Sequence, residues 1–529
     1  MKWATKLAGG ALCAAWMMGV SCTAAPARAT AAPVAPGAMP RVGTVDERFQ
    51  SYNIEAVEVT GGRFWKPYAS VDASHATAQP AANMSPGTDP SLYEYRPPID
   101  LNNPRLRKLA AALGPAYVRV SGTWMNSTYF QDSDDPVPAQ PPAGFNSVLT
   151  RQQWKGVIDF AHAVNARIVT SFAMSTGTRD AAGVWTSKVA QAFMAYTKSA
   201  GGSITAAEFM NEPTFASVGG APKGYDAQAY ARDFVVFQAW AKSNAPGMRI
   251  MGPGGIGEGT PLAPPFMHLL TSEGILKATG PVFEIFSYHS YGAVSSRCAV
   301  TTLEIGTTKE AALSVDWLSR AASAEAFYAA LRDRYEPGKP IWNSETAQAA
   351  CGGDRWAATF LDTFRYLNQL GSLARVGVQV HMHNTLNASD YGLLDEKTLE
   401  PRPDYWAALL WRKLMGSTVL DPGPSPSANL HLYAHCLRDR PGGVALLAIN
   451  ADKDSEQRLQ LPLSADGYTL TAAELTSSTI DLNGKRLDLG PDDVLPVLRG
   501  DTVPSGTVAI APASIMFLAF PNAGNASCR

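Results

Sequence analysis

The sequence favours an α/β fold in which a (β/α)8 TIM barrel is followed by an antiparallel β-sandwich. As far as about residue 415, short apolar runs alternate with longer amphipathic stretches, which is typical of parallel strands joined by helices. From about Gly416 the chain changes to short β-rich runs separated by turn residues. A length of 529 residues is enough for one large core and a second, smaller one.

The first 29 residues have the organisation of a secretory signal. Lys2 and Lys6 precede an apolar stretch over 7–20, and small residues lead to a cleavage site near Ala29. The chain is therefore expected to be secreted or periplasmic. Lipid attachment at Cys22 is the less favoured alternative, because the leucine usual before such a cysteine is missing.

The next residues, 30–42, are rich in Ala and Pro and are expected to form a flexible tether. The catalytic barrel is then expected over 43–415 and the β-sandwich over 416–529. Residues within 40–48 are a candidate for one additional strand of the sandwich.

Eight candidate strands and the helical stretches between them indicate the barrel. The strands are expected at 49–59, 116–122, 166–174, 204–213, 249–255, 283–292, 340–347 and 375–384. The helices with apolar residues at three- and four-residue spacing are 104–113, 154–164, 185–199, 227–243, 322–335 and 355–370. The polar segment 61–100 lacks periodicity and is expected to be a long loop over the barrel mouth.

The composition excludes several kinds of partner. Charged residues make up only 17% of the chain and the net charge is -2, so no basic footprint for nucleic acid is present. After the signal, no apolar run approaches the roughly 20 residues of a membrane span. We expect a monomer that acts on a carbohydrate, without nucleic acid or membrane partners.

Four cysteines remain once the signal is removed: Cys298, Cys351, Cys436 and Cys528. An even number in an oxidising compartment predicts two disulfides, with buried free thiols as the alternative. No two of them have the close spacing of zinc ligands, so no metal is expected.

Two glutamates lie where barrel enzymes carry their chemistry, at the carboxyl ends of strands. Glu212 ends the fourth candidate strand, in FMNEP, and Glu345 ends the seventh, in WNSET. Hydrolysis of a glycoside with retention uses two carboxyl groups roughly 5 to 5.5 Å apart, one as acid/base and one as nucleophile. Asn211, next to Glu212, is placed to bind a neighbouring sugar hydroxyl. Most glutamates in a chain like this one are ordinary surface carboxylates. The positions of Glu212 and Glu345 at strand ends are what favour a catalytic role for these two.

The sixth candidate strand ends in SYHSY, where His289 and Tyr291 alternate onto one face. A tyrosine hydroxyl can bond the nucleophile and a histidine can tune its charge. A structural His and a core Tyr are the alternative.

Four segments together resemble glycoside hydrolase family 79, the heparanase and β-glucuronidase family. They are AAEFMNEPTF around Glu212, SYHSYG, IWNSETAQAACGG around Glu345, and the long stretch DYGLLDEKTLEPRPDYWAALLWRKLMGSTVL over 390–420. The resemblance extends over nearly the whole mature chain. It implies a retaining hydrolase that needs no cofactor or metal, with Glu212 as acid/base and Glu345 as nucleophile.

The resemblance also implies a set of substrate contacts. Tyr391 and the backbone of Gly352 and Gly353 are expected to hold a uronic carboxylate, and Glu55, Thr123 and Asn211 to contact hydroxyls. Cys436 and Cys528 resemble the sandwich disulfide of the family. A Cys298–Cys351 bond that braces the active-site loops is our own inference, because Cys351 stands where the family has a glycine.

Two further departures affect the sugar contacts, since the animal member has Asp at the position of Glu55 and Asn at that of Asp390. The leading hypothesis is therefore a heparanase-like endo-β-glucuronidase acting on a polysaccharide of the heparan sulfate type. Exo-acting release of terminal glucuronic acid from polysaccharide or oligosaccharide is the alternative. A noncatalytic carbohydrate-binding protein on the same scaffold is the alternative of another class, and it would predict the loss of one glutamate.

Overall fold

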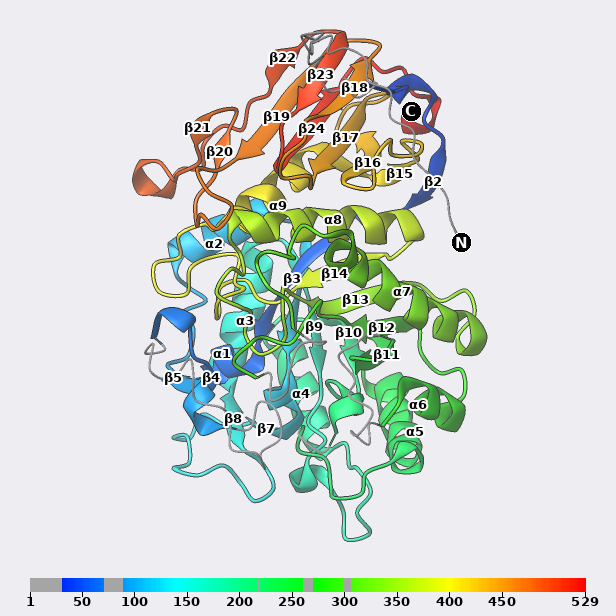
Figure 1. The fold of residues 1–529 in the computed structure, drawn as a ribbon. Helices are drawn as coiled ribbons and strands as arrows, with labels where there is room; N and C mark the ends of the chain where they lie inside the picture. The colour runs from blue at the N-terminus through cyan, green and yellow to red at the C-terminus, as the bar shows by residue number, and fades with distance from the viewer. Residues whose placement is uncertain (1–30, 71–88, 217–218, 260–269, 299–305) are drawn as a thin grey trace, which may run out of the picture.

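A closed barrel of eight parallel strands, surrounded by helices, carries a β-sandwich on one side in the computed structural model (Figure 1). The structure describes residues 31–70, 89–216, 219–259, 270–298 and 306–529. The expected signal at 1–29 and Cys22 lie outside these residues. The predicted fold class, a (β/α)8 TIM barrel with a C-terminal antiparallel sandwich, is confirmed.

All eight predicted strands are present and follow one another around the barrel in chain order. They are β3 (Gln50–Glu55), β6 (Ala116–Ser121), β9 (Ala166–Ser171), β10 (Ile204–Glu208), β11 (Arg249–Ile256), β12 (Ile285–His289), β13 (Ile341–Thr346) and β14 (Val380–His383). The last strand pairs in parallel with the first, which closes the barrel.

Helices follow these strands and cover the outside of the barrel (Figure 1). They are α2 (Pro104–Ala112), α3 (Arg151–Ala163), α4 (Lys188–Ser199), α5 (Ala227–Asn244), α6 (Ser272–Thr279), α7 (Val315–Tyr335), α8 (Phe360–Val376) and α9 (Pro403–Leu414). Each of the six predicted helices overlaps one of them. Local sequence explains several boundaries: Asn103 and Thr150, for example, cap the first turns of α2 and α3 with their side chains.

The barrel interior is apolar toward the amino ends of the strands and charged toward their carboxyl ends. Its apolar layer combines side chains from seven strands: Tyr117, Val169, Ala206, Met251, Ile285, Trp342, Val380 and Met382. Two residues further along β6 and β10 stand Arg119 and Glu208, which are also buried and form an ion pair. Since strand residues two apart share a face, polar side chains occupy the interior toward the carboxyl ends of the strands.

The first predicted strand, 49–59, is too long. The strand ends at Glu55, and α1 (Ala56–Thr60) begins at once because Glu55 and Glu58 form a reciprocal capping box. The following segment, 61–100, is also not simply a loop, because β4 (Gly62–Trp65) and β5 (Tyr93–Arg96) pair as an antiparallel ribbon. A second small sheet, of β7 (Thr128–Gln131) and β8 (Ser147–Thr150), follows β6.

The C-terminal region supplies ten strands to a sandwich in which a nine-stranded sheet packs on a three-stranded one, and the N-terminal segment described below adds one strand to each sheet. Its strands are β15 (Met415–Leu420), β16 (Leu430–Leu437), β17 (Val444–Asn450), β18 (Gln457–Leu461), β19 (Ala465–Thr471), β20 (Asp481–Leu482), β21 (Lys485–Arg486), β22 (Asp501–Val503), β23 (Gly506–Ile510) and β24 (Ser514–Phe520).

Strand β17 explains how the sandwich joins the barrel. Val444, Leu446 and Ala448 face the core between the two sheets, whereas Leu447 and Ile449 belong to the large core shared with the barrel helices. Alternation along the strand thus supplies both cores, and every residue of the strand is buried. Helices α8 and α9 lie between sandwich and barrel (Figure 1).

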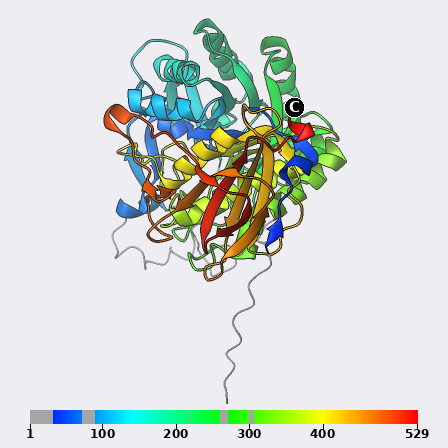
Figure 2. The same cartoon turned by 90° about the horizontal axis from the view of Figure 1, so that it is seen from above.

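The predicted flexible tether is wrong for the described residues of 30–42. β1 (Ala32–Pro33) pairs with β18, and β2 (Arg41–Thr44) pairs with β15, beside the C-terminal sheet (Figure 2). Val34 and Met39 are buried in the sandwich core, so the apolar side chains in this stretch outweigh its Ala/Pro composition. The additional strand considered for 40–48 is present, and the barrel proper begins at β3.

The Cys436–Cys528 disulfide joins β16 to the C-terminus across 92 residues. Replacing both cysteines by serine should lower the free energy of unfolding by about 4 kcal/mol, because the crosslink restricts the unfolded chain. Urea unfolding of oxidised wild type and the double variant measures this. A difference below about 1 kcal/mol, or a wild type insensitive to reductant, would contradict the expectation.

Candidate active site

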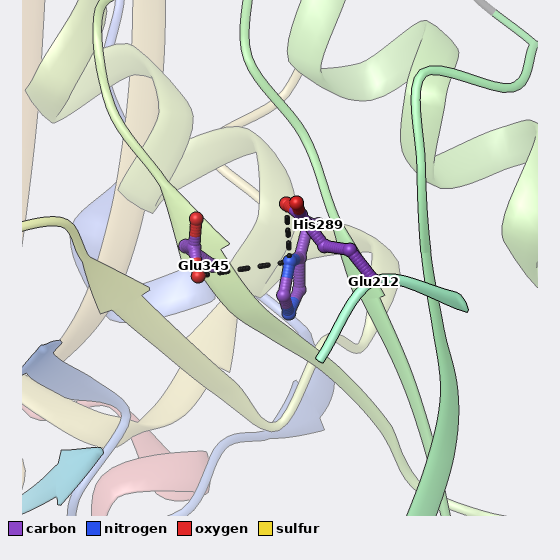
Figure 3. Close-up of side chains that lie close together, drawn as sticks. All are labelled: Glu212, His289 and Glu345. Atoms are coloured by element: carbon purple, nitrogen blue, oxygen red, sulfur yellow. Dashed lines mark hydrogen bonds and ion pairs between the residues drawn. The ribbon is translucent and has the colours of Figure 1, made fainter. Parts of the chain in front are cut away.

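Glu212 and Glu345 face each other at the barrel mouth, with His289 between them (Figure 3). Glu212 follows β10, and Glu345 lies near the end of β13. One carboxylate oxygen of each and one ring nitrogen of His289 all lie within 4.8 Å of one another. The structure therefore brings together the two glutamates that the sequence singled out.

His289, at the end of β12, links the two carboxyl groups. Its Nδ1 lies 2.9 Å from Glu212 Oε1 and 3.7 Å from Glu345 Oε2. Burial opposes a charge on the ring, but Glu345 and the hydrogen bonds to Glu208 and Glu212 outweigh it and raise the pKa of His289 to about 9. The ring is thus a cation at neutral pH.

Arg119 on β6 connects Glu345, the candidate nucleophile, to Glu208 and Asn211. Its guanidinium donates to Glu345 Oε2 at 2.8 Å, to Glu208 Oε2 at 2.8 Å and to Asn211 Oδ1 at 2.6 Å. Tyr291 donates to the other oxygen of Glu345 at 2.6 Å. Both oxygens of Glu345 are therefore held, which fixes the carboxylate plane.

Glu212 has a left-handed backbone, with φ 45°, immediately before Pro213. Such a conformation is costly for a residue with a side chain, and it persists where neighbours fix it. Asn126, in the 3-10 turn η4 (Thr123–Ser127), supplies that support: it accepts from Asn211 N at 2.8 Å and donates to Asn211 O at 2.9 Å. This clamp fixes the backbone of Asn211, which directly precedes Glu212.

The pKa shifts divide three carboxyl groups of the site into two kinds. Burial and the charge of Glu345 raise the pKa of Glu212, and the same two causes raise the pKa of Glu55 well above its usual range. Burial acts on Glu208 as well, but Arg119 outweighs it and lowers the pKa of Glu208. The raised pKa values favour the neutral forms of Glu212 and Glu55, which limits the negative charge around Glu345.

A second hydrogen-bond network joins Glu55, Tyr291 and Tyr391 through Asn384. Asn384 donates to Glu55 Oε1 at 3.1 Å, to the Tyr291 hydroxyl at 3.1 Å and to the Tyr391 hydroxyl at 3.2 Å. Tyr391 is buried, and a side-chain carbon built on Gly353 would lie 3.3 Å from Tyr391 Cβ. Glu55, Tyr291 and Tyr391 therefore line one side of the site with the glycine loop.

Gly352 and Gly353 both have positive φ, 83° and 85°, which glycine adopts without strain. The Gly353 N–H donates to Ala349 O at 3.2 Å, so it is already engaged within its loop. Thr123 begins η4 next to Gly122, which lies against the Glu55 carboxyl. In the described part of the chain, the structure gives the Thr123 hydroxyl no hydrogen bond to another site residue.

The inferred Cys298–Cys351 disulfide is present and connects the loop after β12 to the loop after β13. Cys351 directly precedes Gly352 and has a positive φ of 63°. The crosslink thus holds the glycine loop next to the Tyr291 strand end.

Sequence reasoning missed four site residues: Arg119, Asn126, Glu208 and Asn384. A signal for Arg119 is present, since an arginine in the otherwise apolar run AYVRV requires a buried partner. Asn126 and Asn384 are in irregular segments where polar residues are ordinary, so no local pattern distinguishes them from other loop residues.

The cluster of Glu212, His289 and Glu345 has the spacing of a metal site. A histidine binds a metal through its neutral ring, whereas the raised pKa keeps His289 protonated at neutral pH. Protonation of His289 therefore competes with metal binding at this cluster. No helix in the described parts of the chain is long and apolar enough to cross a membrane.

The chain is similar to known glycoside hydrolases. Residues 97–371, about half of the chain, match the model of the glycosyl hydrolase family 79 N-terminal domain. The chain is 28% identical to heparanase of Mus musculus, covering 87% of this chain and 94% of that one. It is 27% identical to baicalin-beta-D-glucuronidase of Scutellaria baicalensis, covering 80% and 84%.

Solved structures share the fold at low identity. A 4-O-alpha-L-rhamnosyl-beta-D-glucuronidase from Fusarium oxysporum matches with a TM-score of 0.58 at 15% identity, over 93% of this chain and 99% of that one. An alpha-L-arabinofuranosidase from Thermotoga maritima matches with a TM-score of 0.62 at 14% identity, over the same shares. The family match extends over more than half of the chain, and the chain belongs to glycosyl hydrolase family 79 and is a glycoside hydrolase.

Proposed function

We propose that this glycoside hydrolase cleaves β-glucuronidic bonds with retention, using Glu345 as nucleophile and Glu212 as acid/base. The observation that carries the proposal is the proximity of the two carboxyl groups, because one oxygen of Glu212 lies within 4.8 Å of one oxygen of Glu345. Retaining enzymes keep their carboxyl groups roughly 5 to 5.5 Å apart, whereas inverting enzymes need about 6.5 to 9.5 Å to admit a water.

In the first step, a Glu345 oxygen attacks the anomeric carbon while Glu212 gives its proton to the departing glycosidic oxygen. The raised pKa of Glu212 keeps that proton available. In the second step, Glu212 takes a proton from water, whose oxygen attacks the anomeric carbon and displaces Glu345. Arg119 and Tyr291 hold the nucleophile throughout.

The glucuronide is favoured over a neutral sugar by the groups around Tyr391. The Tyr391 hydroxyl and the loop backbone at Gly352 are expected to bind the uronic carboxylate, and Gly353 N–H would have to leave Ala349 O to join them. A neutral Glu55, consistent with its raised pKa, adds no negative charge near that carboxylate. The glucuronidase and heparanases among the relatives support the same substrate class.

Heparanase-like endo action on a heparan sulfate-type polysaccharide is the finer form of this proposal, and exo action on terminal glucuronic acid is its alternative. Disulfides also support a secreted or periplasmic location.

The test is product analysis on an aryl β-D-glucuronide and on heparan sulfate. Proton NMR of the glucuronide reaction should show β-glucuronic acid as the first product; α-glucuronic acid would overturn the retaining mechanism. Large fragments from the polymer would establish endo action, and single sugars exo action. If neither substrate is cleaved, glucuronide specificity is wrong.

The pH profile provides a prediction for His289. Because the His289 cation favours the charged form of Glu212, replacing His289 by Gln should raise the pKa of Glu212 further. The basic limb of kcat/KM should then move to higher pH, with a lower maximum, on the aryl glucuronide. A basic limb at unchanged or lower pH would show that Glu212 does not control it.

A further inference from the structure

Tyr391 is held at two points by consecutive residues at the end of β14. The Asn384 side chain donates to the Tyr391 hydroxyl at 3.2 Å, and Nε2 of His383 lies 2.8 Å from the Tyr391 backbone oxygen. His383 is the last residue of β14, and Asn384 follows it directly. The two contacts fix both the backbone and the tip of one tyrosine, and no step of the proposed mechanism gives His383 a role.

The His383 ring faces the helix layer rather than the barrel interior. Met382, the residue before it, belongs to the apolar layer inside the barrel, so alternation along the strand turns His383 outward toward α8. The ring is fully buried and packs edge-on against Tyr366 of α8, with centroids 5.4 Å apart and ring planes at 87°. This packing holds the ring in place independently of Tyr391.

The protonation of His383 makes it a donor to Tyr391. Burial and the charge of Arg365 lower the pKa of His383 to about 4, so the ring is neutral at neutral pH and carries one N–H. Since a backbone oxygen can only accept, that hydrogen is on Nε2. Nδ1 has no hydrogen-bond partner in the part of the chain that the structure describes. Within that part, the bond to Tyr391 is therefore the single hydrogen bond of this side chain.

The two residues before Tyr391 are fixed by another side chain. Arg402 donates to Ser389 O at 3.2 Å and to Asp390 O at 2.6 Å. Together with the bond from His383, three successive carbonyl groups are engaged, but only the bond from His383 is made to Tyr391 itself. Because a tyrosine side chain has only two torsions, a shift of the Tyr391 backbone would move its hydroxyl as well.

We propose that His383 is a positioning residue for uronate binding: its Nε2–H fixes the Tyr391 backbone and thereby the place of the hydroxyl that meets the uronic carboxylate. The inference rests on the proposed function and deepens it, because it names a residue that sustains the preference for an acidic over a neutral sugar. A hydrogen bond to a carboxylate is strong only at a short distance and near-linear angle. A displaced Tyr391 should therefore weaken binding of the acid more than binding of a neutral analogue.

The test compares an aryl β-glucuronide with its methyl ester, which lacks the carboxylate charge. The ester is measured as a substrate, or by its Ki as a competitive inhibitor if it is not cleaved. His383→Phe keeps a ring beside Tyr366 but has no donor; it should raise KM for the acid about tenfold and change kcat and the ester values by less than about twofold. His383→Gln, whose amide nitrogen can take the place of Nε2, should keep KM for the acid within about threefold of wild type.

His381→Phe is the matched control for the change in the core. His381 lies two residues earlier on the same face of β14, is also fully buried, and has its ring centroid 6.2 Å from that of Tyr366. Neither of its ring nitrogens has a hydrogen-bond partner among the described residues. His381→Phe should therefore leave the preference for the acid unchanged, and thermal unfolding of each variant shows that the folded protein is compared.

Combining the change at His383 with Tyr391→Phe separates positioning from a general structural role. If His383 acts through Tyr391, adding His383→Phe to Tyr391→Phe should cause no further loss of preference for the acid. An unchanged KM for the acid in His383→Phe, an equal loss for acid and ester, or a full additional loss in the double variant would overturn the inference. A wild type that binds acid and ester equally would instead overturn the uronate specificity of the proposed function.

Discussion

Replacing Glu345 by glutamine is expected to lower kcat/KM on an aryl β-glucuronide by about 10⁴-fold or more, because an amide cannot attack the anomeric carbon. The substitution keeps the shape of the side chain and an oxygen that can accept from Tyr291 or Arg119. Loss of activity without loss of folding is therefore the expected result, measured by steady-state kinetics beside thermal unfolding.

Glu325 on α7 offers a matched control, because it is buried to nearly the same degree, 6% exposed against 5% for Glu345. Glu325→Gln should leave kcat/KM within about twofold of wild type. Rescue of glycine variants by azide then distinguishes the nucleophile from the acid/base. With Glu345→Gly azide should attack the vacated face and give an α-glucuronyl azide, and with Glu212→Gly it should give the β-anomer. The same anomer from both variants, or near wild-type activity in Glu345→Gln, would contradict the assignment.

Replacing Arg119 by methionine should have the second large effect, on both stability and activity. The side chain is 1% exposed and is paired with Glu208 and Glu345. Removing one partner of a buried ion pair costs about 3 to 5 kcal/mol, because the remaining charges lose their compensation. Urea unfolding should show this loss at neutral pH, and kcat/KM should fall because Glu345 is no longer held.

The effect should depend on pH in a defined direction. Arg119 lowers the pKa of Glu208 below its unfolded value of about 4.5, so this pair stabilises the fold above that pH and less as the pH falls below it. The difference in unfolding free energy between Arg119→Met and wild type should therefore shrink in acid.

Two variants serve as controls for Arg119→Met. Arg179→Met breaks another buried pair, with Asp233, outside the hydrogen bonds of Glu212 and Glu345. It should cost similar stability but leave kcat/KM of the folded protein unchanged. Arg119→Lys keeps the charge but cannot reach three acceptors, so stability should recover more than activity. Equal kinetic losses in Arg179→Met and Arg119→Met would show that Arg119 acts through stability alone.

The barrel was predictable because its signals are local. Each strand is a short apolar run and each helix repeats its apolar residues every three or four positions, so periodicity alone located both. That Glu212 and Glu345 lie close together was predictable because a strand end in a parallel barrel predicts where a side chain points. The prediction of a flexible tether was wrong because composition does not show which apolar side chains become buried in a core. Here Val34 and Met39 do so.

The sequence by itself determined the order of strands, the pair of strand-end glutamates and an even set of cysteines. Only the tertiary structure decided which distant groups meet: Arg119 bonds Glu345 across 226 positions, and Asn126 bonds Asn211 across 85. It also paired residues 62–65 with residues 93–96 in one antiparallel ribbon beside Gly352. The reason is physical. Local backbone preference depends on neighbouring residues in the sequence. The pKa of a carboxyl group and the shape of a binding face depend instead on distant partners, which only the closed barrel brings within hydrogen-bonding distance.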